Sequence, residues 1–298
     1  MLTSLYRRGA ASRLFDAVNM ALLVLITLLM LYPLWYTIVL SFSSTAALNT
    51  NFYLWPAGAH IDNYQHILRL DSFVQSYRNT VVYSVTGTLL VVVLTIMSAY
   101  PLAIDTFPFR KFWMFFVTFT MLFSGGLIPL YLQVNKLGLI NTIWAIILPG
   151  AISPYNIILM RTFFKFNVPV ELREAAKIDG AGDWSILWHI VVPLSKPIIA
   201  VIALFAFVGH WNSYFDAMIF LTDGKRFPYA LFLRALVLEA GGGGANVGGY
   251  IPSSNIGDVS TIGVRAAGLM IAAVPLLAIY PFLQRYFAQG VLLGSLKG

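Results

Sequence analysis

The sequence predicts an all-α, polytopic membrane protein with six transmembrane helices and a cytoplasmic two-helix loop between the fourth and the fifth. Two features of composition predict this class: 59% of the 298 residues are hydrophobic, and only 10% are Asp, Glu, Lys or Arg. Soluble domains carry about 25% charged residues, and a soluble fold with so few would expose large apolar patches. The third observation is that the charges are clustered, which leaves long uncharged stretches. Together these features exclude a soluble enzyme, and the absence of cysteine excludes a disulfide scaffold.

Each long uncharged stretch can hold one membrane span, because a bilayer core of about 30 Å needs roughly 20 helical residues. The first also has room for an outer loop. Its apolar part is too long for the core of a signal peptide, so it is expected to remain as an anchor. Helices are favoured over barrel strands because the hydrophobic residues do not alternate with polar ones. The stretches are 17–61, 79–104, 112–135, 137–160, 197–215 and 266–284.

The distribution of basic residues predicts the orientation. With six spans, twelve of the 19 Lys and Arg residues fall on the side of the N-terminus and seven on the other side. Because cytoplasmic loops carry the excess of positive charge, both termini are expected in the cytoplasm. Membrane topology therefore accounts for the net charge of +7 without a nucleic-acid partner. The expected organisation is an N-terminal segment with the first helix and outer loop (1–74), a five-helix core (75–289) and a cytoplasmic tail (290–298).

The sequence has no visible catalytic or nucleotide-binding signature. Its one Gly-Lys pair, Gly224-Lys225, leads into Arg226 and lacks the Ser or Thr of a phosphate-binding loop. The four histidines are not spaced as metal ligands. Such a polytopic chain is a passive channel, an ion-coupled carrier, or one subunit of a machine whose motor is another chain.

The longest cytoplasmic loop, 165–196, predicts two short helices. Pro169 suits the first turn of a helix, and Glu171 complements its positive end. The first helix is expected to stop at Gly180, since glycine tolerates the reversed turn that ends a helix. Asp183 is expected to cap the second helix. The apolar face of that helix, and then the two prolines expected to end it, are Trp184, Leu187, Trp188 and Val191, followed by Pro193 and Pro197.

The residues of this loop also resemble a known family. Glu174-Ala-Ala-Lys-Ile-Asp-Gly-Ala181, followed by Ile190-Val-Val-Pro193, resembles the EAA loop of permease subunits in bacterial ABC importers. The sequence departs from that pattern at Val192, where the family prefers Leu. An interfacial hairpin that merely anchors the loop would explain the second helix. It would not explain a small Ala-Ala face flanked by charges.

The resemblance implies that the loop docks into a cleft on a separate cytoplasmic ATPase and transmits its closure to the membrane helices. It implies a second homologous permease chain and two ATPase subunits that bind ATP and magnesium. It also implies an external or periplasmic sugar-binding protein and an oligosaccharide substrate. This chain itself is then no enzyme and holds no cofactor. The residues to which the resemblance assigns ATPase coupling are Glu174, Ala175, Ala176, Asp179, Gly180, Ile190 and Pro193.

Polar residues in the fifth span are the candidate substrate pathway, because polar groups inside a span are costly. Asn212 and Asp216 are four residues apart and are expected to share one helix face, with Ser213 beside them. An aromatic ring beside amide and hydroxyl groups suits a sugar, and hydrogen bonding between helices is the alternative. The pathway candidates are His210, Trp211, Asn212, Tyr214 and Asp216.

Glycine and proline predict further features. Ser124-Gly-Gly-Leu-Ile-Pro129 is expected to break the third helix, as in transporters whose broken helices line a substrate path. The glycine-rich outer loop, 223–262, is either a linker or a segment that enters the binding protein, as in the maltose-importer permease that this layout resembles. The tail 290–298 resembles the ends of sugar-importer permeases, which reach the ATPase interface. A frayed terminus is the alternative.

Three more strings, 126–131, 138–149 and 159–164, look like the branch of oligosaccharide permeases that imports uronic-acid oligomers, alginate among them. The resemblance thus implies an acidic sugar. Two alternatives from other classes stay open. A self-contained, ion-coupled secondary sugar transporter would need inverted repeats and a buried acid, for which Asp216 is the candidate. A membrane enzyme acting on lipid-linked sugars would need clustered acids or histidines at one interface. Neither accounts for the Glu-Ala-Ala loop.

Overall fold

The computed structural model describes residues 10–44, 54–56, 58–239 and 261–295, and the regular structure in these ranges is helical. This confirms the all-α class that the sequence predicts. The chain divides into two compact units, one comprising Met1–Leu68 and Ser253–Ile271 and the other Arg69–Pro252 and Ala272–Gly298. The last helix, α15 (Thr261–Ser295), contributes to both. It includes most of the predicted tail, of which 296–298 lie outside the described residues.

The first unit joins a long apolar helix, α1 (Ala10–Phe42), to a short one, α3 (Asp62–Arg69). Asn63 of α3 is fully buried, and its amide donates hydrogen bonds to the carbonyls of Ser41 (3.0 Å) and Ser43 (3.1 Å). Carbonyls at a helix end have no partner within the helix, so Asn63 fastens α3 to the end of α1. Gly263 of α15 lies close against it, since a Cβ there would meet Asn63 Nδ2 at 2.6 Å.

Replacing Asn63 with Ala is expected to lower the free energy of unfolding by about 1–3 kcal/mol, because a buried amide with two hydrogen bonds is lost. Thermal unfolding of the purified chain in detergent measures this change. Gln65→Ala, at an exposed position of the same helix, is the matched control and should leave the midpoint unchanged. Equal midpoints for the two variants would contradict the fastening role of Asn63.

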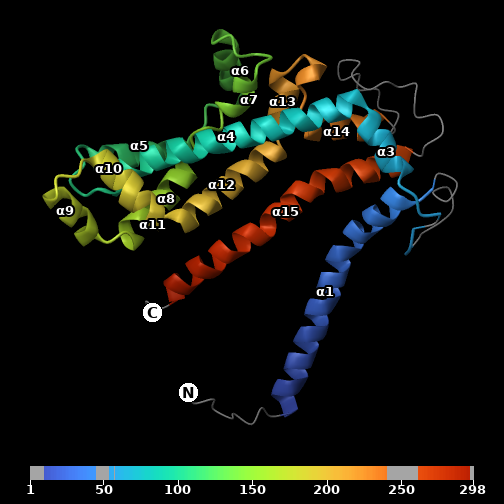
Figure 1. Cartoon of the computed structure of the whole chain (residues 1–298), viewed down its shortest axis with the longest axis horizontal. Helices are drawn as coiled ribbons and strands as arrows, with labels where there is room; N and C mark the ends of the chain where they lie inside the picture. The colour runs from blue at the N-terminus through green and yellow to red at the C-terminus, as the bar shows by residue number, and fades with distance from the viewer. Residues whose placement is uncertain (1–9, 45–53, 57, 240–260, 296–298) are drawn as a thin grey trace. The chain divides into compact units, whose positions relative to one another are not determined.

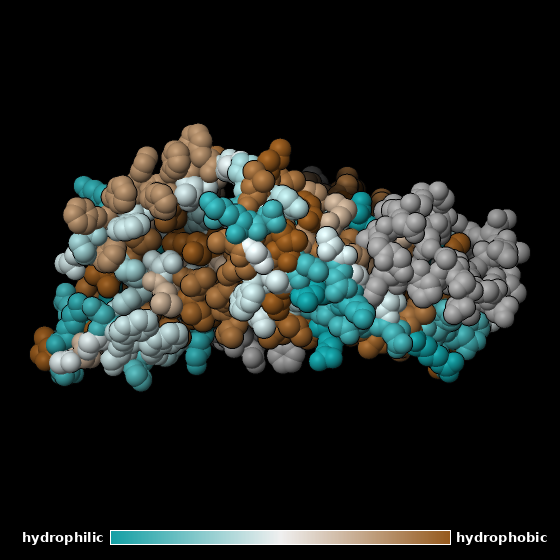
Figure 2. Space-filling model, turned by 90° about the horizontal axis from the view of Figure 1, so that it is seen from above, coloured by the Kyte–Doolittle hydropathy of each residue, from teal (hydrophilic) through white to brown (hydrophobic). Residues whose placement is uncertain are grey.

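The second unit is built along one helix, α4 (Asp71–Ala103), of 33 residues. α8 (Pro154–Asn167) and α12 (Lys196–Trp211) pack along it, as Figure 1 shows. Their buried apolar side chains form the main core, to which the three helices contribute Ile96, Met160 and Ile202 among others. The buried hydroxyl of Thr80 donates back to the carbonyl of Ser76 (3.0 Å), so this polar group is satisfied within α4. Figure 2 shows apolar side chains over much of the middle of this unit, as suits helices that meet lipid.

The predicted break in the third span is present. α5 (Arg110–Leu122) and α6 (Leu127–Lys136) meet at an angle of 111°. Gly126, directly before α6, has a φ of +86°, a backbone conformation that residues with a side chain rarely adopt. The glycines and the proline of the 124–129 string thus end one helix and start another.

The predicted fourth span, 137–160, is not one continuous helix. The structure has the five-residue α7 (Ile143–Ile147) there, and α8 begins only at Pro154. Pro149 and Gly150 follow Leu148, the C-cap of α7, and both residue types oppose continuation of a helix. Among the described residues three helices are long and apolar enough to cross a membrane, or up to five if each bent pair is one span. The six-span count stays a prediction.

Short helices gather at the two ends of α4 (Figure 1). At one end lie α9 (Val170–Ile178), α10 (Asp183–Ile186), a π-helical turn η1 (Leu187–Val191) and α11 (Val192–Leu194). Toward the other end lie α13 (Phe215–Phe220), a 3₁₀ turn η2 (Gly224–Arg226) and α14 (Tyr229–Glu239). The glycine runs of the predicted outer loop, 241–244 and 248–249, lie outside the described residues.

Candidate functional site

The first candidate site is the loop between α8 and α12, which begins with an exposed helix. α9 starts directly after Pro169, whose φ of −56° is already helical, and carries Glu171 in its first turn. No residue of α9 is buried, and Ile178 at its end is 86% exposed although it is apolar. Such a surface is available to another protein. The predicted coupling residues that lie exposed here are Glu174, Ala175 and Asp179.

Gly180 ends α9 in the manner that the sequence predicts. Its φ of +82° lies in the left-handed region, which glycine adopts without steric cost. The N–H of Ala181 donates to the carbonyl of Ala176 (2.8 Å), and the N–H of Gly180 donates to that of Lys177 (3.0 Å). This pair of bonds is a Schellman motif, which satisfies the last carbonyls of the helix. Because Ala176 and Ala181 both pack against the main core, the turn holds α9 in a defined place.

The second helix anchors the loop in the core. Ile186, Leu187 and Val191 are each at most 3% exposed and lie in one cluster with residues of α4, α8 and α12. Ile190 packs against the same cluster, and Pro193 lies exposed in α11, before an 82° bend into α12. The predicted apolar face is therefore only partly buried. Its tryptophans are at the surface: Trp184 is 62% exposed and Trp188 is 42% exposed.

Asp183 does not cap the second helix as predicted. Gly182 holds the N-cap position, and Asp183 is the first helical residue, with no side-chain capping bond. Its carboxylate instead lies 3.5 Å from Lys177 Nζ of α9, on the far side of the glycine turn. An exposed ion pair of this kind contributes at most about 1 kcal/mol, so it supplements the Schellman turn rather than replacing it.

A carboxylate beyond the end of α4 connects three helices beside this loop. Asp105 accepts hydrogen bonds from Lys165 of α8, at 3.1 Å from Nζ, and from Arg110 of α5. The bond from Lys165, and then the bond from Arg110, lower the pKa of the Asp105 carboxyl below its usual value. Asp105 also lines a cavity of about 330 Å³ together with Arg173 and Glu174 of α9. The end of α8, from which α9 departs, is thereby held to α4 and α5.

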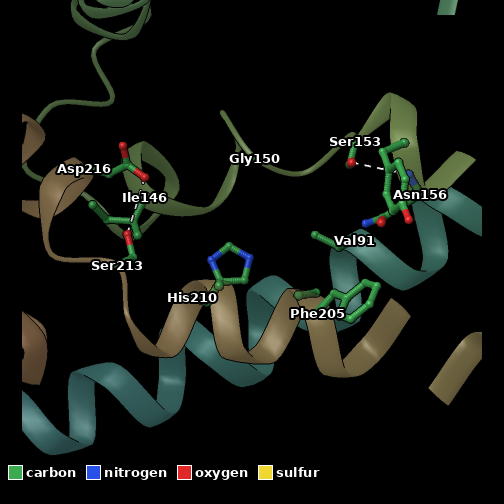
Figure 3. Close-up of a pocket in the computed structure, with 12 residues that line it drawn as sticks. Val91, Ile146, Gly150, Ser153, Asn156, Phe205, His210, Ser213 and Asp216 are labelled. Atoms are coloured by element: carbon green, nitrogen blue, oxygen red, sulfur yellow. Dashed lines mark hydrogen bonds between the residues drawn. The ribbon is translucent and has the colours of Figure 1, made fainter. Parts of the chain in front are cut away.

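The second candidate site is a cavity of about 460 Å³ lined by residues of α4, α7, α8, α12 and α13 and of the segments between them (Figure 3). His210 points into it from α12. The hydroxyl of Ser213 donates to the carboxylate of Asp216 at 3.4 Å. Hydroxyl, amide, imidazole and carboxylate groups are those that can hydrogen-bond the hydroxyls of a sugar. The polar lining residues are Ser153, Tyr155, Asn156, His210, Ser213 and Asp216.

Gly87 of α4 determines where His210 can lie. A Cβ at position 87 would stand 2.5 Å from His210 Nε2 and 2.6 Å from its Cδ2, a separation that packed atoms do not adopt. Only a residue without a side chain lets α12 bring this imidazole against α4. The position of His210 in the cavity lining therefore depends on this contact.

Comparison with known proteins assigns the family. The family model described as the inner membrane component of binding-protein-dependent transport systems matches residues 80–293. The chain belongs to this family. The matched range includes the whole α9–α11 loop and every residue that lines the larger cavity. The predicted resemblance to permease subunits is confirmed.

Individual relatives match the permease over nearly its whole length. Protein LplC of Bacillus subtilis (strain 168) is 38% identical over 292 residues, which are 97% of this chain and 96% of LplC. The polygalacturonan/rhamnogalacturonan transport system permease protein YtcP of the same organism is 37% identical over 297 residues, 96% of this chain and 99% of YtcP. Among solved structures, a chain of a bacterial ABC transporter involved in the import of the acidic polysaccharide alginate has a TM-score of 0.87 at 31% identity. The matched region covers 94% of this chain and 98% of the chain in that structure.

Two of the five predicted pathway residues, His210 and Asp216, line the cavity of the permease. Trp211 does not, since it is 2% exposed and its ring packs on Tyr77 and Phe207 at centroid distances of 5.7 and 5.5 Å. Tyr214 is not among the lining residues either, and the guanidinium of Arg234 lies over its ring.

The expectation that Asn212 and Asp216 share one helix face is wrong. α12 ends at Trp211, and Asp216 belongs to a separate helix, α13. The backbone N–H and the side-chain amide of Asn212 both donate to the carbonyl of Val208, at 3.1 and 2.9 Å. A side chain that bonds the preceding turn in this way competes with the regular helix, and here it marks the end of α12.

Sequence reasoning missed the first turn of α8. Ser153 is the N-cap of α8 and accepts a hydrogen bond from the Asn156 N–H at 3.4 Å, and both residues line the cavity. The pair Ser153-Pro154 is a helix-start signal, an N-cap serine followed by proline at the first helical position. Reading that signal would have placed the start of α8, and these polar groups, inside the stretch 137–160.

Proposed function

We propose that this chain is one of two different permease subunits of an ATP-driven oligosaccharide importer in the cytoplasmic membrane of a bacterium. With a second, homologous permease it forms the translocation pathway, and an external or periplasmic sugar-binding protein delivers the substrate. Two ATPase subunits on the cytoplasmic side bind ATP and magnesium. Both termini of this chain lie on that side. The family match and the relatives of equal length support the proposal.

The observation that carries the proposal is one loop whose first helix is exposed and whose second helix is anchored in the core by Ile186, Leu187 and Val191. Glu174, on the exposed helix, is available for a charge-assisted hydrogen bond to the ATPase. The small side chain of Ala175 beside it lets a partner's backbone approach closely. Ile178, 86% exposed, would be covered in the complex. These are the properties of a docking helix rather than of an interfacial anchor.

The contacts of the loop give a route for movement. A displacement of α9 acts on the core through Ala176 and Ala181, and through the buried side chains of Leu187 and Val191. These side chains pack among α4, α8 and α12, and α12 carries His210 near its other end, about 20 Å away along its axis. Closure of the ATPase would in this way reshape the cavity.

We propose an acidic oligosaccharide, such as an alginate oligomer, as the substrate. Two comparisons support the acidic class. YtcP is by its name a permease for polygalacturonan and rhamnogalacturonan, and the similar solved structure belongs to an importer of alginate. The polar lining of the larger cavity suits the hydroxyl groups of such a sugar.

Gentle purification of the tagged chain from its native membrane tests the assembly. The expected result is recovery of a second permease and of an ATPase in fixed ratio, with the binding protein added back in the presence of sugar. Reconstituted into vesicles with ATP inside, the complex should take up labelled uronate oligomers only when the binding protein is present. Recovery of the chain without an ATPase, or uptake driven by an ion gradient alone, would overturn the proposal.

A further inference from the structure

The larger cavity offers no cation to an acidic sugar. All of its lining residues lie in the described part of the chain, and none of them is Lys or Arg. Its carboxylate, that of Asp216, would repel the carboxylate of a uronic acid. A cation of this chain that recognises acidic sugars would therefore lie outside this cavity.

Arg234 of α14 is such a cation. The residues on either side of it, Leu233 and Ala235, are 8% and 6% exposed, so the guanidinium emerges from an apolar stretch of helix. Its carbon Cζ lies 5.5 Å from the centre of the Tyr214 ring, and one of its nitrogens lies 2.8 Å from the sulfur of Met218. No carboxylate lies within ion-pair distance of Arg234 among the residues that the structure describes.

The environment of Arg234 leaves most of its hydrogen-bonding capacity unused. A guanidinium has five N–H groups in one plane, and a carboxylate can accept two of them in parallel. A thioether sulfur is a weak acceptor, and an aromatic face attracts the cation without satisfying its N–H groups. The guanidinium lies over the Tyr214 ring, and Tyr214 itself remains 42% exposed. The half-buried Arg234 and the exposed Tyr214 thus lie together, with guanidinium N–H groups free of a protein carboxylate among the described residues.

We propose that Arg234 and Tyr214 form a subsite for the carboxylate of a uronic-acid residue, outside the larger cavity and toward the end of α4 away from α9 (Figure 1). Arg234 pairs with the sugar carboxylate, and the exposed part of the Tyr214 ring contacts the apolar face of the sugar. The subsite gives this subunit selectivity for acidic over neutral oligosaccharides. The inference rests on the proposed function, since it needs a sugar moving past this chain.

The test is uptake of a labelled uronate trisaccharide by the complete importer in vesicles. Arg234→Gln is expected to lower uptake about 10- to 100-fold, the range for loss of a charge-assisted pair. Arg234→Lys keeps the charge but loses the planar fork. Its uptake is expected to lie between that of the unaltered importer and that of Arg234→Gln. Arg78→Gln is the matched control, because Arg78 is an exposed arginine of α4, and it should leave uptake unchanged.

Binding of the trisaccharide and of its neutral methyl ester to the complex is followed by saturation-transfer NMR. Arg234→Gln should weaken only binding of the acid.

The outcomes separate this inference from the proposed function. Undiminished uronate uptake by Arg234→Gln, or equal loss of acid and ester binding, would overturn the subsite. Loss of the second permease from purified Arg234→Gln would also overturn it, since Arg234 would then be a subunit contact. If the unaltered importer takes up neutral sugars but no uronate, the inference falls together with the acidic substrate, while the role as a sugar-importer permease stands. If it takes up no sugar at all with its partners present, the proposed function falls.

Discussion

Gly180→Val is expected to lower sugar uptake about 5- to 30-fold while ATP hydrolysis by the assembled importer continues. Gly180 has a φ of +82° and ends α9 with the Schellman bonds of Gly180 and Ala181. A left-handed conformation costs a residue with a side chain about 1–2 kcal/mol, and a β-branched residue adopts it only as an outlier. A change of this size shifts a local equilibrium about 5- to 30-fold. The native turn would then be less populated, and α9 would be held to the core less firmly.

Gly182→Val is the matched control for this prediction. Gly182 lies two residues further on, its φ of −73° is ordinary for any residue, and a Cβ at either glycine would meet no atom within 4 Å. The two variants therefore differ in backbone strain and not in crowding. Uptake and ATP hydrolysis are measured on the same vesicle preparation. Normal uptake by Gly180→Val, or equal losses in both variants, would contradict a coupling role for the turn.

The two-helix loop could be predicted closely because its signals are local. Pro169 precedes a helix and Gly180 ends it, each within a residue of the expected place. Residue type alone determines both, through the fixed φ of proline and the freedom of glycine. Even the error at Asp183 is small, since the helix begins one residue earlier and the carboxylate pairs with Lys177 instead.

The cavity could not be predicted in the same way, because it depends on contacts between distant segments. The string 210–216 reads as a continuous helix, yet α12 ends at Trp211. Neither Trp211 nor Tyr214, which follows the end of α12, lines the cavity. Asn156 enters from α8, and Val91 enters from α4. No local pattern of residues reports that these groups meet. Hydrophobic periodicity finds the helices but not which helix lies opposite.

Gly87→Ala has the second-largest expected effect, because it acts on the contact that places His210 in the cavity lining. The added Cβ would stand 2.5 Å from His210 Nε2, so the imidazole must leave α4 and move into the cavity, or α12 must move. Overpacking of this kind costs about 1–3 kcal/mol. We expect a lower thermal unfolding midpoint in detergent and uptake reduced roughly tenfold, a change that corresponds to about 1.4 kcal/mol. Gly209→Ala, beside His210 in α12 but with no atom within 4 Å of its Cβ, is the control, and it should keep or slightly raise the unfolding midpoint, because alanine favours a helix over glycine.

A double variant separates crowding from any other effect of the new methyl group. If the clash with the imidazole is the whole effect, Gly87→Ala should cost nothing further once His210 is replaced by Ala, because the crowded atoms are gone. The unfolding midpoints of the two single variants and the double variant then give a coupling of about the full cost of Gly87→Ala, far outside the few tenths of a kcal/mol seen for independent sites. Additive midpoints would mean that Gly87 acts on α4 alone. The position of His210, and with it the cavity, would then not depend on the absence of a side chain at position 87.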